Sequence, residues 1–312
     1  MKRTISVSSR GTRLALRNSR VMVQKEDAIL AETPIEDLGL VVLETTGVSI
    51  SSGVITALGS AGGALLACDD TFHPCGMYLP MDANSLYSER VRLQACMSAP
   101  LKKNLWAHII RAKIKNQAAV LGPAAGKPLL RLAEKTRSGD AGATEGQASR
   151  IYWPLVFASC EAITQHPFRR RREGKPPNNL LNYCYAVLRA ATARALCVAG
   201  LQPVMGLHHQ NRYSGFCLAD DVMEPFRPVA DAVVRDIVAA GSLAIDKEVK
   251  KQLIGVLMRD VVIDGERTAL WVALERTGSS LAKAIEAQVK HGASAPEAAR
   301  LLVLPGICAP CH

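Results

Sequence analysis

The pattern of hydrophobic residues changes sharply near residue 80 of this 312-residue chain. Before that point apolar runs are short, and glycines separate them, which is typical of strands and turns. Beyond it, apolar residues recur at helical spacing over long stretches. The chain is therefore predicted to be α+β, with a β-sandwich-like domain at residues 1–80, a linker at 81–90, an all-α-helical domain at 91–306 and a tail at 307–312.

The N-terminal runs predict six strands, one short helix and a long loop. The strands are expected at residues 4–8, 14–16, 20–24, 28–30, 38–44 and 63–69, and the helix at 51–58. After the last strand, a segment rich in proline, glycine and asparagine passes His73, Pro80 and Asn84, and it predicts a loop.

The helical part has its strongest pattern at residues 178–200, where Gly200 is a good C-terminal stop. The residues expected in its buried stripe are Leu181, Tyr185, Leu188, Ala191 and Ala195. Another helix is predicted to begin near Ser138, to carry Glu145 in its first two turns and to end at Pro154. Further helices are expected at residues 87–94, 101–112, 155–163, 229–240, 247–258, 270–290 and 296–304, with a loop at 122–127 and a turn at 264–265.

Basic residues are concentrated in the middle third of the sequence. The whole chain has a formal net charge of +10. Residues 95–200 alone contain 17 lysines and arginines against 5 aspartates and glutamates, so the excess lies in this third. Such a local excess indicates a surface for phosphate groups, and four consecutive arginines are typical of a loop that contacts a nucleic-acid backbone. The candidate DNA-binding residues are Lys102, Lys103, Arg111, Lys113, Lys115, Arg169, Arg170, Arg171, Arg172 and Arg189.

Composition narrows the class of protein and its location. A hydrophobic fraction of 48% and a charged fraction of 21% exclude disordered and fibrous chains. The sequence has neither an N-terminal export signal nor an uncharged run of membrane-spanning length, so we expect a cytoplasmic protein. Its nine cysteines lie within apolar patterns, which favours reduced core thiols over disulfides. The C-terminal CAPCH has the spelling of a haem attachment motif, but without export we expect an irrelevant tail.

Two histidines and three acids lie close together in the segment at residues 206–228. His208 and His209 precede Asp220, Asp221 and Glu224, and a turn between them would bring imidazole and carboxylates together. Asp221 and Glu224 share a helix face because they are three residues apart. This pattern is typical of a divalent-metal site, but the same residues also suit a structural role, with Asp220 as a helix cap and His209 in the core.

Glu145 is a further candidate metal ligand from another part of the sequence, because it lies among glycines, alanines and a serine that leave room for a ligand. An acid at a helix N-terminus also stabilises the helix by up to about 1 kcal/mol, so the position has a structural explanation as well. Glu145, together with His209 and an acid from the segment Asp220 to Glu224, would complete a set of ligands for Mg²⁺ or Mn²⁺. Beside a basic surface, such an ion indicates phosphodiester chemistry.

Four long segments of the sequence carry a resemblance to a known family. They are SERVRLQACMSAPLKKNLWAHIIRAKIKNQAAVL from Ser88, SGDAGATEGQASRIYW from Ser138, NNLLNYCYAVLRAATARAL from Asn178 and GLHHQNRYSGFCLADDVMEPFRPVAD from Gly206. In these segments the chain resembles the CRISPR-associated endonuclease and integrase family, which inserts new spacers into CRISPR arrays. The similarity covers nearly the whole chain, and its order and spacing resemble the shorter members found beside type II systems.

The resemblance implies a catalytic and metal-binding set made of Glu145, His209 and Glu224, with Asp221 as an auxiliary ligand. His209 is chosen over His208 because the family's histidine lies three residues after a glycine that Gly206 matches. Two departures concern packing only. Gly146 replaces the alanine that usually follows the catalytic glutamate, and Cys184 replaces a glycine common in the tyrosine-rich helix.

The resemblance also implies how the protein acts. The N-terminal domain would form a homodimer, and the helical domain would be catalytic. A second CRISPR adaptation protein would join two such dimers into an integration complex for antiviral defence. The 3′-hydroxyl of prespacer DNA would attack a phosphodiester at the CRISPR repeat, and activity would fall below about pH 6.5, where histidine is protonated.

Two other functions remain open from the sequence. A metal-dependent DNA nuclease would use water in place of the 3′-hydroxyl, with the same ion and ligands. A non-catalytic DNA-binding scaffold would keep the same basic surface, and its acids and histidine would be structural. The products of the reaction, joined or cut DNA, distinguish the integrase from the nuclease. Alanine substitution of Glu145 distinguishes both enzymes from the scaffold, because it would abolish only an enzyme's chemistry.

Overall fold

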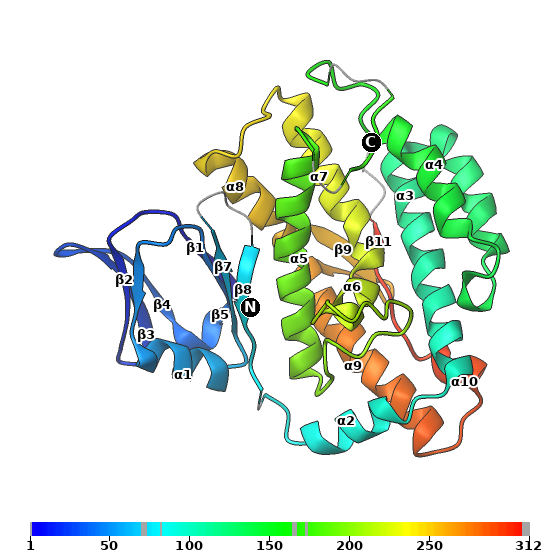
Figure 1. Cartoon of the computed structure of the whole chain (residues 1–312), viewed down its shortest axis with the longest axis horizontal. Helices are drawn as coiled ribbons and strands as arrows, with labels where there is room; N and C mark the ends of the chain where they lie inside the picture. The colour runs from blue at the N-terminus through cyan, green and yellow to red at the C-terminus, as the bar shows by residue number, and fades with distance from the viewer. Residues whose placement is uncertain (1, 70–73, 82, 164–166, 172–173, 308–312) are drawn as a thin grey trace.

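The computed structural model describes residues 2–69, 74–81, 83–163, 167–171 and 174–307, and Figure 1 shows a β-rich part beside a larger helical part. The predicted loop at His73, the arginine at position 172 and the CAPCH tail lie wholly or partly outside the described residues. The described strands of the N-terminal part are β1 (Arg3–Val7), β2 (Thr12–Arg17), β3 (Arg20–Lys25), β4 (Ala28–Pro34), β5 (Leu38–Leu43), β6 (Val48–Ile50), β7 (Ala64–Cys68) and β8 (Pro74–Tyr78).

These strands form two four-stranded sheets with α1 (Ser52–Ser60) beside them. One sheet has the order β4-β3-β2-β6, in which β2, β3 and β4 form an antiparallel meander and β6 pairs parallel with β2. The other has the order β1-β5-β7-β8, in which β1, β5 and β7 are parallel. A short 3-10 helix, Ile35–Asp37, joins β4 to β5. The core between the sheets contains Val7, Leu14, Val21, Val23, Leu38, Val41, Val54 and Leu58.

Strand β5 connects this core to the helical part because its two faces are buried in different cores. Leu38 and Val41 pack with the N-terminal core, whereas Leu40 and Val42 belong to the large core of the helical part. Side chains alternate across the strand from Leu40 onward, and a register shift in the pairing with β1 places Leu38 on the opposite face from Leu40. The continuous apolar run of this segment is the pattern of a strand buried on both faces. The close approach of Trp271 to β5 is possible because Gly39 has no Cβ atom.

The helical part is built around α5 (Asn178–Val198), which lies near the centre of Figure 1. All five residues predicted for its buried stripe are buried, but so is most of its circumference. A helix that is apolar on all sides is one that other helices surround. The other described helices of this part are α2 (Tyr87–Ala95), α3 (Ala99–Lys135), α4 (Thr144–Val156), α6 (Cys217–Val222), α7 (Arg227–Ala239), α8 (Lys247–Ile254), α9 (Leu270–Val289) and α10 (Ala295–Ala299), of which α6, α7, α8 and α9 pack against α5.

The prediction of an all-helical domain is wrong, because a three-stranded sheet lies within it. Strands β9 (Asp260–Ile263) and β10 (Glu266–Ala269) form a hairpin, and β11 (Gly306–Ile307) pairs with β9. The predicted turn at Asp264 and Gly265 is the tip of this hairpin, where both residues have positive φ. Asp-Gly between apolar runs is a strong hairpin signal, so β9 and β10 could have been predicted from the sequence.

Other local predictions also need correction. Pro74–Tyr78 forms β8 and is not a loop. The expected loop at 122–127 is a single break in α3, where Gly122 adopts a positive φ. Pro154 does not end α4, which continues to Val156, and residues 155–163 contain turns in place of a further helix. The last helix is α10, which ends at Ala299.

A buried carboxylate joins the two parts of the protein where β5 ends. Glu44 is 1% exposed, accepts hydrogen bonds from Ser6 (2.7 Å) and from the Tyr183 hydroxyl of α5 (2.9 Å), and lies 3.2 Å from the Lys250 ammonium of α8. The N-terminal sheet is thereby fixed to the central helix by polar contacts as well as by the shared core.

We predict that Glu44→Gln lowers the free energy of unfolding by about 3 kcal/mol, because it removes the negative charge beside the buried Lys250 ammonium. Chemical denaturation measures the change. Glu266→Gln is the matched control, since Glu266 pairs with Arg276 on the surface and such pairs contribute less than about 1 kcal/mol. Equal losses in the two variants would contradict this role for Glu44.

Candidate active site

The turn before α4 fixes Glu145 in the first turn of that helix. Asp140, in the 3-10 turn Ser138–Asp140, accepts hydrogen bonds from the backbone amides of Thr144 (2.8 Å) and Glu145 (3.1 Å). Its carboxylate therefore satisfies helix amides that have no intrahelical partner. The position predicted for Glu145 is confirmed, and its side chain is 31% exposed.

Lys113 of α3 lies between Glu145 and the second acid, Glu224. Its ammonium is 2.6 Å from Glu145 Oε1 and 2.6 Å from Glu224 Oε2. Glu224 is in the 3-10 turn Glu224–Phe226, and its other oxygen lies 3.1 Å from Arg227 Nη1. The prediction that Lys113 belongs to the exposed basic face is wrong, because this lysine is buried and holds two carboxylates.

The charges of this cluster support one another. Burial lowers the pKa of Lys113, but Glu224 and Glu145 outweigh it and hold that pKa above its usual value. Burial likewise raises the pKa of Glu224, whereas Arg227 and Lys113 together hold it below its usual value. The lysine and the glutamate are therefore both charged at neutral pH.

His209 is held by Asp221, which was predicted as an auxiliary metal ligand. The Asp221 carboxylate is fully buried, lies 2.5 Å from His209 Nδ1, and accepts hydrogen bonds from the backbone amides of Leu207, His208 and His209. The hydrogen bond to Asp221 raises the pKa of His209, and partial burial opposes that rise. Each Asp221 oxygen thus has a partner, so Asp221 orients the histidine and leaves its Nε2 atom available.

The loop that carries the two histidines is shaped by close packing. Gly206 allows the loop to fold back, because a Cβ atom there would collide with the His209 carbonyl oxygen and with Cys217. The His208 ring stacks on Trp106 of α3 with centroids 4.3 Å apart, and the same indole meets His209 edge-on at 5.6 Å. Trp106 is almost fully buried, so these contacts fix both imidazoles.

Asp220 differs from its predicted role. It lies within α6, and its carboxylate is 2.6 Å from Arg189 of α5, so it does not cap the helix. Arg189 was predicted to bind DNA, and this ion pair occupies part of its guanidinium. Both residues line the same cavity as the candidate ligands.

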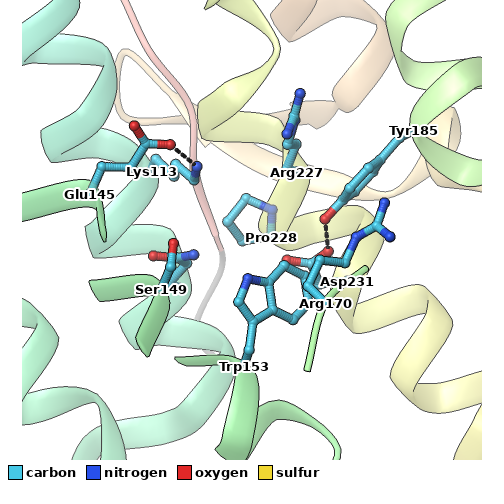
Figure 2. Close-up of a pocket in the computed structure, with 10 residues that line it drawn as sticks. Lys113, Glu145, Ser149, Trp153, Arg170, Tyr185, Arg227, Pro228 and Asp231 are labelled. Atoms are coloured by element: carbon cyan, nitrogen blue, oxygen red, sulfur yellow. Dashed lines mark hydrogen bonds and ion pairs between the residues drawn. The ribbon is translucent and has the colours of Figure 1, made fainter. Parts of the chain in front are cut away.

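Glu145, His209 and Glu224 line one cavity of about 880 Å³, together with Arg170, Tyr185 and Arg227. A neighbouring cavity of about 320 Å³ extends past Glu145, and Figure 2 shows its lining. The three predicted residues, from segments far apart in the sequence, therefore border one space.

The smaller cavity ends at a buried aspartate that sequence reasoning missed. Asp231 of α7 accepts hydrogen bonds from the hydroxyls of Tyr152 (2.9 Å) and Tyr185, and Figure 2 shows the second contact. Burial raises the pKa of Asp231 to about 6, although both tyrosines oppose the rise. Arg227 was also missed, and its position three residues after Glu224 could have indicated a shared face.

The predicted DNA-binding residues are divided between the surface and the cavity. Lys103, Lys115, Arg169 and Arg171 are exposed, and Lys102 lines a hollow beside His209. Arg170 faces the cavity, where it donates hydrogen bonds to Asn178 (3.0 Å) and Asn182 (2.6 Å). Arg111 donates to the carbonyl of Thr136, so part of its guanidinium supports the turn before α4.

The side chains suit a divalent ion chemically, although in the described residues no three acids, histidines or cysteines converge closely enough to hold one. Two carboxylates and an imidazole with an oriented second nitrogen are ligands that Mg²⁺ and Mn²⁺ accept. Glu224 Oε2 is buried and lies 2.6 Å from the Lys113 ammonium. The cation that joins the carboxylates here is a lysine ammonium.

A family model and curated relatives identify the family of this chain. The family model of CRISPR associated protein Cas1 matches residues 5–264. A CRISPR-associated endonuclease Cas1 from Neisseria meningitidis is 36% identical over 276 residues, which are 86% of this chain and 88% of the relative. Another, from Pyrobaculum aerophilum, is 27% identical and covers 75% of this chain and 82% of its own length.

Solved structures show the same fold at low identity. A casposase bound to integration product superposes with a TM-score of 0.74 at 18% identity and covers 92% of this chain and 91% of its own. A CAS1 protein from Thermotoga maritima superposes with a TM-score of 0.73 at 16% identity, and the coverage is 91% and 96%. The fold is common to all of these, and the family model spans most of the sequence, so this chain belongs to the CRISPR-associated Cas1 family.

Proposed function

We propose that this protein is a metal-dependent DNA integrase that inserts prespacer DNA into a CRISPR array, and that it thereby serves CRISPR adaptation and antiviral defence in the cytoplasm. The observation that carries the proposal is the single cavity lined by Glu145, His209 and Glu224. In a member of this family, such a set of ligands beside basic side chains suits chemistry on a phosphodiester.

In this proposal Glu145, His209 and Glu224 hold Mg²⁺ or Mn²⁺. The ion supplies positive charge at the phosphate oxygens and so favours attack on phosphorus. Asp221 holds the imidazole in one orientation and tautomer, which replaces the direct ligand role expected from the sequence. Binding needs a neutral imidazole, so His209 must lose the proton that Asp221 favours.

The reaction is a direct transesterification. The 3′-hydroxyl oxygen of the prespacer forms a new bond to phosphorus at the repeat boundary, and the bond from phosphorus to the existing 3′-oxygen breaks. No protein residue becomes covalently attached. Arg170 and Arg227 line the cavity and supply fixed positive charge for the phosphate that reacts.

The substrate is double-stranded DNA, both prespacer and repeat, held by its phosphates. Exposed Lys103, Lys115, Arg169 and Arg171 would contact the backbone around the cavity. Two solved structures with this fold are a Cas1-DNA complex and a Cas6-RT-Cas1–Cas2 complex. These neighbours support DNA and a second CRISPR adaptation protein as partners of this chain.

Dimerisation is assigned to the N-terminal part of the chain. Strand β4 is an edge strand, and it exposes Ile29 (55%) and Leu30 (58%). An exposed edge strand with large apolar residues is prone to pair with another chain. We propose that a second copy covers this edge in the homodimer.

A metal-dependent DNA nuclease is the second candidate, because the curated relatives are named endonucleases. The same cavity would serve, and water would attack in place of the 3′-hydroxyl. A non-catalytic scaffold is the third, and it predicts no chemistry at the site.

We predict that Glu145→Ala lowers strand transfer at least about 100-fold and leaves DNA affinity largely unchanged, because the variant loses a ligand but keeps the basic surface. The assay uses purified protein with and without its partner, short duplex DNA with free 3′-hydroxyls, a plasmid with repeats, and Mg²⁺ or Mn²⁺. Glu134→Ala, an exposed glutamate on α3, is the control. Cut but unjoined DNA would favour the nuclease, and equal activity of both variants would contradict a catalytic Glu145.

We predict that Asp221→Asn lowers strand transfer about 10- to 100-fold and moves the acid limb of its pH profile to lower pH. The Asp221 carboxylate raises the pKa of His209 above 6.5, so the wild-type limb should lie above the sequence-based value. Without the carboxylate, imidazole loses its proton at lower pH. Initial rates from pH 5.5 to 9 measure the limb, and an unchanged position would rule out this role of Asp221.

We predict that Leu30→Lys weakens the homodimer, because a charge at the β4 edge must then be buried or repelled in the paired state. Sedimentation velocity over a concentration series measures the association. Leu130→Lys, which changes a 45%-exposed leucine on α3, serves as the control. Unaltered association of the Leu30 variant would place the dimer contact elsewhere.

A further inference from the structure

The Lys113 ammonium occupies the point where the two carboxylate ligands of the proposed metal site meet. It comes from the middle of α3, Glu145 from the start of α4 and Glu224 from the turn before α7. Both ammonium-to-oxygen distances are 2.6 Å, and the Lys113 side chain is 9% exposed. Figure 2 shows the contact between Lys113 and Glu145 at one side of the smaller cavity.

The charges around this point are balanced without a divalent ion. Lys113 and Arg227 contribute two positive charges, and Glu145 and Glu224 contribute two negative charges. Two carboxylates so close together repel each other unless a cation lies between them. The lysine meets that need, so both carboxylates remain directed at one point in the metal-free protein.

We propose that Lys113 is an internal cation that keeps the two carboxylates assembled and competes with the divalent ion for them. This inference rests on the proposed function, because it concerns the same ligands. When Mg²⁺ or Mn²⁺ binds, the ammonium withdraws from at least one of the two glutamates, and the positive charge there is exchanged for that of the metal.

The two cations of the cluster differ in how easily they can move. A lysine ammonium is a point charge on a flexible chain, whereas a guanidinium is a rigid planar fork. Arg227 contacts only Glu224 of the pair and lies over the ring of Tyr185 at 5.1 Å. Lys113 is therefore the cation that moves away when the divalent ion binds, and Arg227 continues to hold Glu224 in place.

Mn²⁺ affinity of the full-length protein, measured by electron paramagnetic resonance of free and bound ion, tests the inference without any reaction. Lys113→Met removes the competing charge and keeps a chain of similar length. We expect Mn²⁺ to bind it about tenfold more tightly than the wild type, the effect of a unit charge beside a divalent ion at water-like screening. The melting temperature of this variant should rise more on addition of Mn²⁺ than that of the wild type.

Two further variants give the measurement its controls. Lys127→Met changes an exposed lysine on the same helix and should leave Mn²⁺ affinity unchanged. Glu145→Ala removes a proposed ligand and should weaken binding. If neither wild type nor Lys113→Met binds Mn²⁺, the metal site itself fails. If both bind and Lys113→Met binds equally or more weakly, the competition is overturned while the metal site stands.

A second measurement uses the wild type and so does not depend on whether the variant folds. Reductive methylation followed by mass spectrometry compares the labelling rates of Lys113 and Lys127 with and without saturating Mn²⁺. A lysine released from its carboxylates is labelled faster, so the ratio of Lys113 to Lys127 should rise with the ion. An unchanged ratio at saturation would overturn the proposal.

Discussion

The ion pairs of one buried lysine with two glutamates hold the candidate site together. Lys113, Glu145 and Glu224 come from three segments that are not adjacent in the sequence, and the ammonium brings them to one cavity. A buried charge is tolerated only with partners, so each member of the cluster constrains the others. Helices α3 and α4 and the turn before α7 are therefore held together by ion pairs as well as by apolar packing. The cavity between them is lined by polar and charged side chains.

The rest of the fold holds the elements that carry this cluster in place. Central helix α5 is buried on nearly all sides, and its Tyr185 ring lies beside Arg170 and Arg227 at the cavity. The same helix reaches the N-terminal part through Tyr183, which donates to Glu44. Helix α5 thus links the end of strand β5, which is buried on both faces, to the candidate site.

Sequence reasoning succeeded where local patterns carry the information. The periodicity of residues 178–200 predicted α5 and its buried stripe, and Gly200 ends the helix with a positive φ. The resemblance to the family also pointed to Glu145, His209 and Glu224, and these three residues border one cavity. Glu145 at the start of a helix and His209 in a loop after Gly206 are both marked by their neighbours in the sequence, and these marks do not depend on distant contacts.

It failed where distant contacts decide. Lys113 has the pattern of a basic surface residue, and only the packing of α3 against α4 and the 224–226 turn buries it. The partners of Asp221 were not predicted either: three backbone amides and an imidazole contact its oxygens, and its expected role as an auxiliary metal ligand stays a prediction. The β9–β10 hairpin was missed because its strands are short, although its Asp-Gly tip carried a signal.

The most direct test of the account is the position of bound metal. Crystals of the protein grown with duplex DNA and Mn²⁺ should give an anomalous peak in contact with Glu145, Glu224 and the Nε2 atom of His209. The Lys113 ammonium should then have moved away from at least one glutamate. An occupied Mn²⁺ site elsewhere, or no peak at saturating Mn²⁺ with Lys113 still between the carboxylates, would contradict the central claim.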